Sequence, residues 1–277
     1  MRLVANARMY AVAPAAATAW RTVLEWVVAR AGVDAEVIEH LAPAPLAALW
    51  AREDLGCAFM CGRPFATAVP RPTLLAAPVP NPPAYGGQPI YWTDLVVAAE
   101  SPVAAPEEAF GGCFAWTSFD SQSGWLAPSA YLARRAKTRS GQLFACAVGP
   151  LVTPRAVAVA IAEGRADLGP LDSYAHDLLR RHEPVLAARL RVVASTPQTP
   201  IPPLVGAASL APAVAANLRA ALLAVGDAPE LAPARAALLL SRFASVDPGC
   251  YDALADAAPG AEAGRFGIAQ DHTGRAD

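Results

Sequence analysis

The chain has 277 residues, a formal net charge of −2 and a pI of about 6.1. Hydrophobic residues make up 55% of it and charged residues 17%, which excludes global disorder and can fill one large domain or two modest lobes. Because the charge is nearly balanced, no basic field points to a nucleic-acid partner. No stretch is long and apolar enough to predict a transmembrane helix.

The N-terminus carries no signal-peptide pattern, because Met1 and Arg2 are followed at once by an apolar run that predicts a strand. We therefore expect a periplasmic protein if a leader precedes this numbering, and a cytoplasmic one otherwise. The 5 cysteines leave one unpaired in any disulfide scheme and most stand among small apolar residues, which favours core thiols and a reducing compartment. Cys57 and Cys61 lack a second ligand pair, so no zinc site is predicted, and no cofactor is expected.

Up to residue 89 the chain alternates between strand and helix. Strands are predicted over residues 3–12, 35–40 and 55–60, and helices over 18–31, which Gly32 ends, and 46–52. This βαβαβ order predicts a parallel sheet with covering helices. Residues 78–89 are rich in Pro and Gly and predict a loop.

A second α/β series follows a strand predicted over residues 90–99. Strands over 113–117, 143–148 and 166–171 alternate with helices over 123–137, 154–162 and 173–181. Residues 190–195 predict a returning strand, 197–203 a Pro-rich loop, and the chain from residue 210 on mostly helix. We therefore expect two α/β lobes joined by two crossing strands: residues 1–89 with 194–277 form lobe I, and residues 90–193 form the inserted lobe II.

The sharpest chemical signal is the segment Asp120-Ser121-Gln122-Ser123-Gly124, between a predicted strand and a predicted helix. A helix start exposes unpaired N–H groups and partial positive charge, so it binds phosphate-like anions without a formal cation. The Ser121 and Ser123 hydroxyls add donors. On spacing alone a plain helix cap is the simpler explanation of the same residues, because Ser and Asp are common caps.

Two further segments are candidates for a ligand site. Asp172 and Tyr174 follow a strand at its carboxyl end, where ligands of open α/β sheets bind, although Asp172 is also a good helix cap. Tyr91 and Trp92 start the first crossing strand and could wall a cleft. His176 and His182 lie beside Arg180 and Arg181, and we interpret them as a solvated helix face. No nucleophile elbow, P-loop or dinucleotide fingerprint is present.

Short motifs follow one another in a fixed order over residues 3–206. They are Cys61-Gly62 after a strand, Tyr91-Trp92, Ser121-Gln122-Ser123-Gly124, Gly164-Arg165-Ala166-Asp167 after an apolar helix, Asp172-Ser173, and Ser195-Thr196-Pro197. In this order the chain resembles the phosphate/phosphonate-binding component of ABC transporters. The resemblance implies a two-lobed type 2 periplasmic-binding-protein fold, each lobe a mixed sheet flanked by helices, joined by two crossing strands.

The resemblance also implies site roles. Ser121, Gln122 and Ser123 would hold the oxyanion, Tyr91 would touch the ligand from the cleft wall, and Asp172 or Tyr174 would face its other end. Cys61 occupies a first-lobe ligand position that is often Tyr in the family. Binders that select an amino group carry a His-Glu pair where this chain has residues 149–153, Gly-Pro-Leu-Val-Thr. A carboxylate expected near Tyr174 is also replaced, so the specificity end is more apolar while the anion end is kept.

The leading hypothesis is a solute-binding protein that closes over a phosphonate- or phosphate-like oxyanion for ABC-type import, without catalysis. It is expected to be a monomer that is not membrane-embedded, with an ABC permease as its partner. A cytoplasmic enzyme on the same fold, such as those of cofactor biosynthesis, is the second hypothesis, with a carboxylate-bearing metabolite as substrate. A ligand sensor that reports to another protein is the third.

Overall fold

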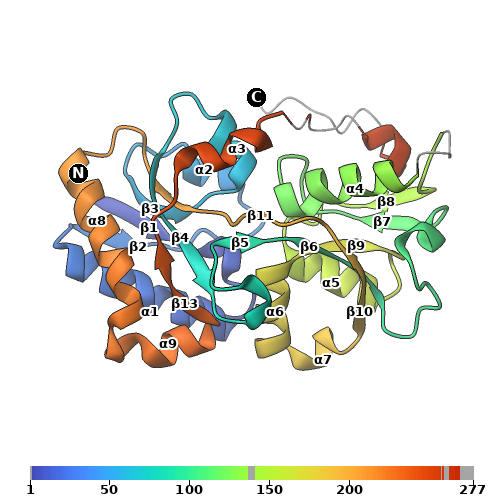
Figure 1. The fold of residues 1–277 in the computed structure, drawn as a ribbon, viewed down its shortest axis with the longest axis horizontal. Helices are drawn as coiled ribbons and strands as arrows, with labels where there is room; N and C mark the ends of the chain where they lie inside the picture. The colour runs from blue at the N-terminus through green and yellow to red at the C-terminus, as the bar shows by residue number, and fades with distance from the viewer. Residues whose placement is uncertain (1, 137–140, 257, 259–261, 269–277) are drawn as a thin grey trace. The chain divides into compact units, whose positions relative to one another are not determined.

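The chain forms two compact units in a computed structural model that describes residues 2–136, 141–256, 258 and 262–268 (Figure 1). Unit 1 comprises Met1–Tyr91 and Thr199–Asp256, and unit 2 comprises Trp92–Gln198 and Ala257–Asp277. The sequence prediction placed residues 257–277 in lobe I. The described part of that segment belongs instead to unit 2, because Ala263, Phe266 and Ile268 are buried in its core.

Unit 1 is built on a six-stranded sheet with strand order β13-β4-β12-β3-β1-β2. Strands β2 and β3 pair parallel with β1, whereas β12 runs antiparallel to β3 and β4, and β13 runs antiparallel to β4. A separate antiparallel pair joins β5 to β11. The strands of unit 1 are β1 (Leu3–Asn6), β2 (Ala35–Val37), β3 (Leu55–Phe59), β4 (Thr73–Pro80), β5 (Ile90–Tyr91), β11 (Thr199–Pro200), β12 (Leu204–Gly206) and β13 (Leu240–Ala244).

Helices cover the sheet of unit 1 on both sides (Figure 1). The longest, α1, starts with Pro14 at its first position and ends at Gly32, whose φ of 63° lets its N–H bond back to the last helical carbonyls. The α-helices of unit 1 are α1 (Pro14–Ala31), α2 (Leu46–Trp50), α3 (Gly62–Thr67), α8 (Pro212–Ala224) and α9 (Ala232–Ala237). Short 3₁₀ turns span Arg8–Tyr10, Pro83–Tyr85, Val225–Asp227, Pro229–Leu231 and Pro248–Leu254.

Unit 2 combines an antiparallel sheet of order β10-β6-β9 with a parallel pair, β7-β8, that a bridge between Phe114 and Leu168 links to the segment before β9. Its strands are β6 (Thr93–Ala98), β7 (Cys113–Ala115), β8 (Cys146–Val148), β9 (Gly169–Asp172) and β10 (Leu190–Ser195). Its helices are a π-helical turn (Gln122–Leu126) that continues into α4 (Ala127–Arg135), then α5 (Pro154–Ala162), α6 (Ser173–His182) and α7 (Pro184–Ala187), with 3₁₀ turns at Pro106–Ala109 and Ala263–Phe266. No helix in the described residues is long and apolar enough to span a bilayer.

Three predicted elements were wrong in length or type. The first strand ends at Asn6, where the chain turns into a 3₁₀ segment, instead of running to residue 12. Strand β4 runs into the predicted loop as far as Pro80, and β13 lies in the region predicted to be mostly helical. Both misses have one cause, because β13 pairs with the Pro-containing half of β4, and proline argues against a strand in sequence-based prediction.

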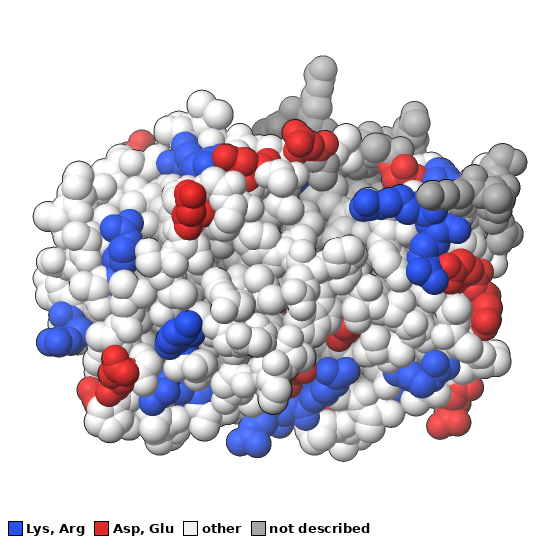
Figure 2. Space-filling view, viewed as in Figure 1, with Lys and Arg blue, Asp and Glu red and all other residues white. Residues whose placement is uncertain are grey.

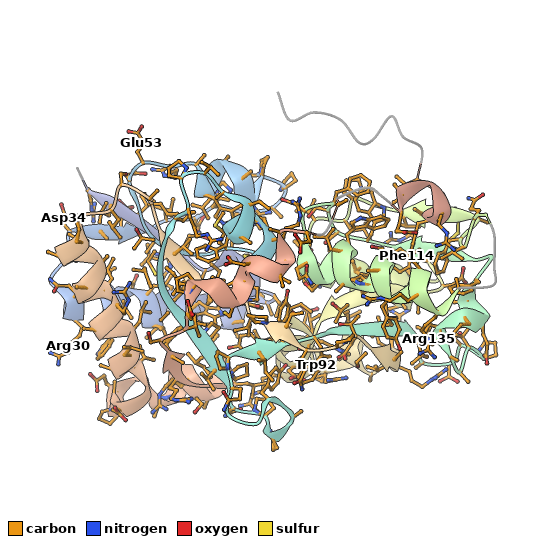
Figure 3. All side chains as sticks on the ribbon, turned by 45° about the horizontal axis from the view of Figure 1, so that its top comes forward. Arg30, Asp34, Glu53, Trp92, Phe114 and Arg135 are labelled. Carbon is orange, nitrogen blue, oxygen red and sulfur yellow. A yellow bond between two sulfur atoms is a disulfide. The ribbon has the colours of Figure 1, made fainter. Side chains whose placement is uncertain are left out.

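The core of unit 2 is aromatic. Phe114 contacts Trp125, Phe144 and Phe266, with ring centroids 4.9–6.4 Å apart. Phe114 lies among other side chains in Figure 3, whereas Arg30 projects from the surface of unit 1. Such pairs add to the area burial that stabilises a small α/β unit, and they fix β7 against the π-helical turn that follows it.

A disulfide joins Cys113 to Cys146, which are paired in register on β7 and β8 with Cα atoms 4.6 Å apart. The sequence prediction of core thiols was therefore wrong for these two cysteines, because parallel pairing of their strands brings them opposite one another. Among the described residues, Cys57, Cys61 and Cys250 form no disulfide. Burial raises the pKa of the Cys57 thiol to about 12, so this group stays protonated.

Charged side chains of both signs are spread over the face drawn in Figure 2. This distribution agrees with the nearly balanced composition, with a formal net charge of −2.

The disulfide closes a segment with a sequence separation of 33, for which the chain-entropy model gives a stabilisation of about 3–4 kcal/mol. We expect dithiothreitol, or the Cys113→Ser/Cys146→Ser pair, to lower the urea midpoint of unfolding by a corresponding amount. Cys250→Ser, at an exposed position, is the control and should leave the midpoint unchanged. An unchanged midpoint under reduction would show that the disulfide does not form in solution.

Candidate ligand-binding site

The segment predicted to bind the anion forms a tight turn at the start of a helix. Ser121 has extended φ and ψ of −75° and 120°, and its hydroxyl accepts the Gly124 N–H at 3.0 Å. Trp125 and Leu126 both donate to the Ser121 carbonyl, at 3.1 and 3.0 Å, which sets the π-helical register of the first turn. The prediction of a helix cap was therefore correct for Ser121 itself.

Two backbone donors of this turn remain unpaired. The N–H groups of Gln122 and Ser123 have no acceptor among the described residues, nor has the Ser123 hydroxyl a partner there. The π-helical turn runs directly into α4, so the dipole of the joined helix adds to these donors. Residues 121–124 therefore present three neutral donors, which are the two N–H groups and the Ser123 hydroxyl, and they carry no carboxylate. This is the chemistry of an anion site.

Buried polar atoms surround the same turn. The Thr117 hydroxyl packs over Gly124 so closely that a Cβ added there would lie 1.8 Å from it, which is why only glycine fits. That hydroxyl and the Gln122 side-chain oxygen are buried and have no hydrogen-bond partner among the described residues. Unpaired buried polar atoms cost free energy, and they are expected where a polar occupant completes the site.

The loop that follows β8 is held against the strand leading into the turn. Leu151 donates its N–H to the Trp116 carbonyl at 3.0 Å, and Val152 donates to the Thr117 carbonyl at 3.2 Å. Val152 has a φ of 65°, a left-handed conformation that is strained for a β-branched residue, and its side chain is 38% exposed. The loop therefore holds the apolar Val152 side chain near Thr117, in the segment that leads into the anion turn.

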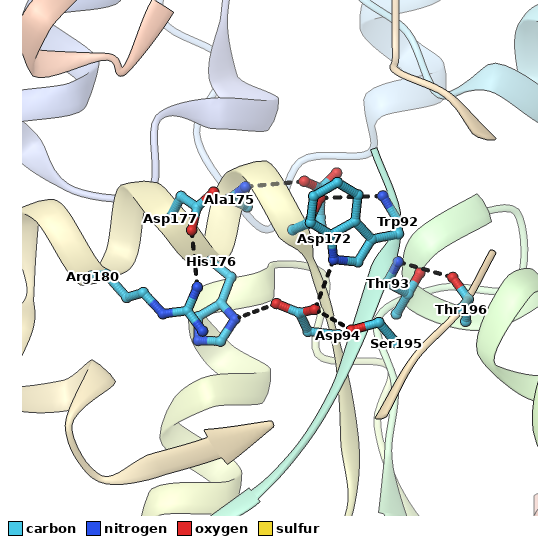
Figure 4. A network of polar contacts seen from close by, with 11 residues as sticks. Trp92, Thr93, Asp94, Asp172, Ala175, His176, Asp177, Arg180, Ser195 and Thr196 are labelled. Atoms are coloured by element: carbon cyan, nitrogen blue, oxygen red, sulfur yellow. Dashed lines mark hydrogen bonds and ion pairs between the residues drawn. The ribbon is translucent and has the colours of Figure 1, made fainter. Parts of the chain in front are cut away.

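A buried polar network lies at the start of the first crossing strand (Figure 4). The Asp94 carboxylate accepts from the Trp92 indole at 2.9 Å, from the Ser195 hydroxyl at 2.8 Å and from His176 Nδ1 at 2.8 Å. The interpretation of His176 as part of a solvated face was wrong: its side chain is 2% exposed, because α6 packs this side against β6. The network ties β6, β10 and α6 together.

Burial alone would raise the pKa of Asp94, but the hydrogen bonds from His176, Ser195 and Trp92 outweigh it and hold that pKa below its usual value. The carboxylate thus stays ionised although the residue is only 5% exposed. Nearly all its accepting capacity is used inside unit 2, which makes Asp94 a structural rather than a ligand-binding carboxylate.

Asp172 and Tyr174 lie where β9 passes into α6. Asp172 caps the helix by accepting the Ala175 N–H at 3.0 Å, and it is 6% exposed. Tyr174 is fully buried, and desolvation, followed by the charges of Asp172 and Asp177, raises the pKa of its phenol well above the usual value. Its hydroxyl therefore remains a neutral donor. Contact of either side chain with ligand stays a prediction.

The remaining two predicted site residues belong to unit 1. Tyr91 is in β5, paired in register with Thr199, and is 2% exposed. Cys61 is half-buried and precedes the first residue of α3, at the carboxyl end of β3. The structure thus brings Ser121, Gln122 and Ser123 together in one turn of unit 2, and the roles of Tyr91 and Cys61 stay predictions.

The sequence matches, over residues 11–251, the family described as "ABC transporter, phosphonate, periplasmic substrate-binding protein". The chain belongs to this family. Its role is that of a solute-binding component of ABC import, which implies a small-molecule ligand and a permease partner. Among curated proteins, none matches the sequence.

Solved structures share the fold. A binding-protein component of an ABC phosphonate transporter from Pseudomonas aeruginosa has a TM-score of 0.76 and 20% identity, covering 90% of this chain and 82% of that one. PhnD1 from Prochlorococcus marinus, in complex with methylphosphonate, has a TM-score of 0.72 and 15% identity, covering 91% and 95%. A histidine kinase sensor domain similar to periplasmic binding proteins has a TM-score of 0.55 and 15% identity, covering 87% and 97%. The predicted two-lobed type 2 periplasmic-binding-protein fold is thereby confirmed.

The Asp94 network predicts a loss of stability in acid. Its pKa is lowered from 3.8, so the full stabilisation is present above about pH 4 and is lost as the pH falls through the depressed folded-state pKa. Asp94→Asn should lower the free energy of unfolding by roughly 1–3 kcal/mol near neutral pH, and should flatten its pH dependence below about pH 4. Urea titrations across this range would measure both effects.

Asp34→Asn is the matched control, because the Asp34 side chain is 81% exposed and pairs only at the surface. It should change neither quantity measurably. If the free energy of unfolding fell as steeply with acid in Asp94→Asn as in the wild type, the assignment of a lowered Asp94 pKa would be contradicted.

Proposed function

We propose that the protein binds a small phosphorus oxyanion, phosphonate or phosphate, at the turn formed by residues 121–124. The observation that carries this proposal is the pair of unpaired N–H groups, of Gln122 and Ser123, next to the unpaired Ser123 hydroxyl. A tetrahedral oxyanion has several acceptor oxygens, so one group can take all three donors at once.

The buried oxygens around the turn support the same occupant. The Thr117 hydroxyl can donate to an anion, and a half-turn of the Gln122 amide replaces its unpaired oxygen with a donor nitrogen of nearly the same shape. The site would then hold the anion with neutral donors alone, and the ligand would supply the charge.

The other end of the ligand is proposed to be apolar. The loop at residues 149–153 carries no ionisable side chain, and its Val152 is held partly exposed beside the anion turn. Asp172 already caps a helix, and the Tyr174 phenol is buried and neutral. Neither is therefore a strong partner for an amino group of the ligand. Methylphosphonate, the ligand of the similar Prochlorococcus marinus protein, is therefore the first compound to test.

In this proposal the protein acts without catalysis, as a monomer that delivers its ligand to an ABC permease. A sensor role is the second candidate, favoured by the similarity of fold to a histidine kinase sensor domain. An enzyme on the same fold would need an acid, base or nucleophile at the turn. The polar side chains of the turn are two serines and an amide, so a serine nucleophile there would need a general base from another segment.

Isothermal titration with methylphosphonate, ethylphosphonate, 2-aminoethylphosphonate, phosphate, sulfate and a set of small carboxylates tests the ligand class. We expect saturable binding of at least one phosphorus oxyanion. The alkylphosphonates should bind more tightly than 2-aminoethylphosphonate, because Asp172 is engaged as a helix cap and the loop at residues 149–153 carries no ionisable side chain. Saturable binding of carboxylates alone would overturn the proposal and favour the enzyme or the sensor.

Ser123→Ala isolates the anion contact. The Ser123 hydroxyl has no protein partner among the described residues, so its removal should leave the melting temperature unchanged while weakening oxyanion binding by roughly tenfold. Ser209→Ala, at an exposed position of unit 1, is the control for the same chemical change. Equal affinity in Ser123→Ala and the wild type would remove Ser123 from the site.

A further inference from the structure

One proline sets the hydrogen bonding of the whole anion turn. Pro128 stands in the first turn of α4 and is buried. Having no N–H, it cannot donate to the carbonyl of Gly124, as an α-helical register would require, or to that of Ser123, as a π-helical register would require. Pro128 therefore supplies a donor to neither carbonyl, and the N–H of Ala127 before it bonds the Gln122 carbonyl.

Both carbonyls receive a donor from a strand instead. The Gly124 carbonyl accepts the Thr117 N–H, just after β7, at 3.4 Å. The Ser123 carbonyl accepts the Thr93 hydroxyl, from the first residue of β6, at 3.1 Å. The missing N–H of Pro128 thus converts a helix start into a turn that is anchored to two strands of unit 2.

Thr93 is itself held firmly. It is 1% exposed, its N–H donates to the Thr196 hydroxyl at 3.0 Å, and its carbonyl accepts the Thr196 N–H at 2.9 Å. Its neighbour in the chain is Asp94, the buried carboxylate shared by His176, Ser195 and Trp92. The hydroxyl that reaches Ser123 therefore comes from one of the most constrained points of the crossing strands.

From these contacts we infer that Thr93 is a positioning residue of the anion site, and that Pro128 makes it necessary. The Ser123 carbonyl shares one peptide plane with the Gly124 N–H, so the Thr93 hydroxyl fixes that plane and the Ser123 Cα at its edge. This Cα carries the Ser123 hydroxyl and is bonded to the unpaired Ser123 N–H, so fixing it positions both donors. Thr93 touches no ligand in this scheme; it acts through Ser123. The same bond connects oxyanion binding to the crossing strands, since a displaced Ser123 would pull on β6.

This inference rests on the proposed function, and two readouts keep the two separable. The first is amide hydrogen exchange of residues 118–127 without ligand. Thr93→Val should speed it roughly fivefold, the effect of losing one bond of about 1 kcal/mol, while Thr93→Ser, which keeps the hydroxyl, should restore it. The second is the methylphosphonate dissociation constant, which Thr93→Val should raise roughly five- to tenfold.

The decisive test is a double-mutant cycle with Pro128→Ala. The new N–H at residue 128 can serve the Ser123 carbonyl in place of Thr93, so the effect of Thr93→Val on exchange should shrink in the Pro128→Ala background. A mere packing role of Thr93 would give equal effects in both backgrounds and would overturn the inference. If Thr93→Val alone does not fold, Pro128→Ala should rescue its folding, and failure to rescue would equally overturn it.

Thr22→Val is the matched control, because the Thr22 hydroxyl bonds a helix carbonyl at an exposed position of α1. It should change neither readout. Wild-type protein that binds no phosphorus oxyanion would overturn the proposed function, and the exchange cycle would still decide whether Thr93 fixes the turn. Normal binding in the wild type with an unchanged dissociation constant in Thr93→Val would overturn the inference alone.

Discussion

In the turn of residues 121–124, the backbone carbonyls must all find donors inside the protein, while two backbone N–H groups must stay without an acceptor. All four carbonyls of this segment have donors: two from the helix for Ser121, the Ala127 N–H for Gln122, the Thr93 hydroxyl for Ser123 and the Thr117 N–H for Gly124. Of the four N–H groups, those of Ser121 and Gly124 are paired, and only the two between them have no acceptor in the described residues. Every backbone acceptor of the turn is occupied, so its two unpaired N–H groups need an acceptor from outside.

This arrangement is costly without a ligand, and the rest of unit 2 supports it. The aromatic cluster around Phe114 and the disulfide at the start of β7 and β8 hold the strand that leads to Thr117. The Asp94 network holds the start of β6, which carries Thr93. Unpaired donors persist in a protein only where the surrounding structure prevents them from relaxing into self-contained bonds. The strained Val152 in the neighbouring loop fits the same description.

Much of this could be predicted from local sequence, because it depends on local signals. Helix α5 and strand β10 have the predicted bounds, since periodic apolar residues and their flanking breakers define them. The anion turn was found from small hydroxyl residues at a strand-to-helix junction. The Asp94–His176 contact could not be predicted, because its partners are 82 positions apart. His176 also shares a helix with Arg180 and Arg181, which suggests a solvated face. Likewise, Pro128 falls inside the helix predicted over residues 123–137, but nothing in the sequence shows which segments donate hydrogen bonds in its place.

The most direct test of this account is the backbone amide spectrum during a titration with methylphosphonate. If the turn holds the oxyanion by its unpaired donors, the amide protons of Gln122 and Ser123 should move far downfield on saturation, while those of Ser121 and Gly124, already bonded within the protein, should move little. Saturable binding that leaves the Gln122 and Ser123 resonances in place would contradict the account, because the ligand would then be bound elsewhere.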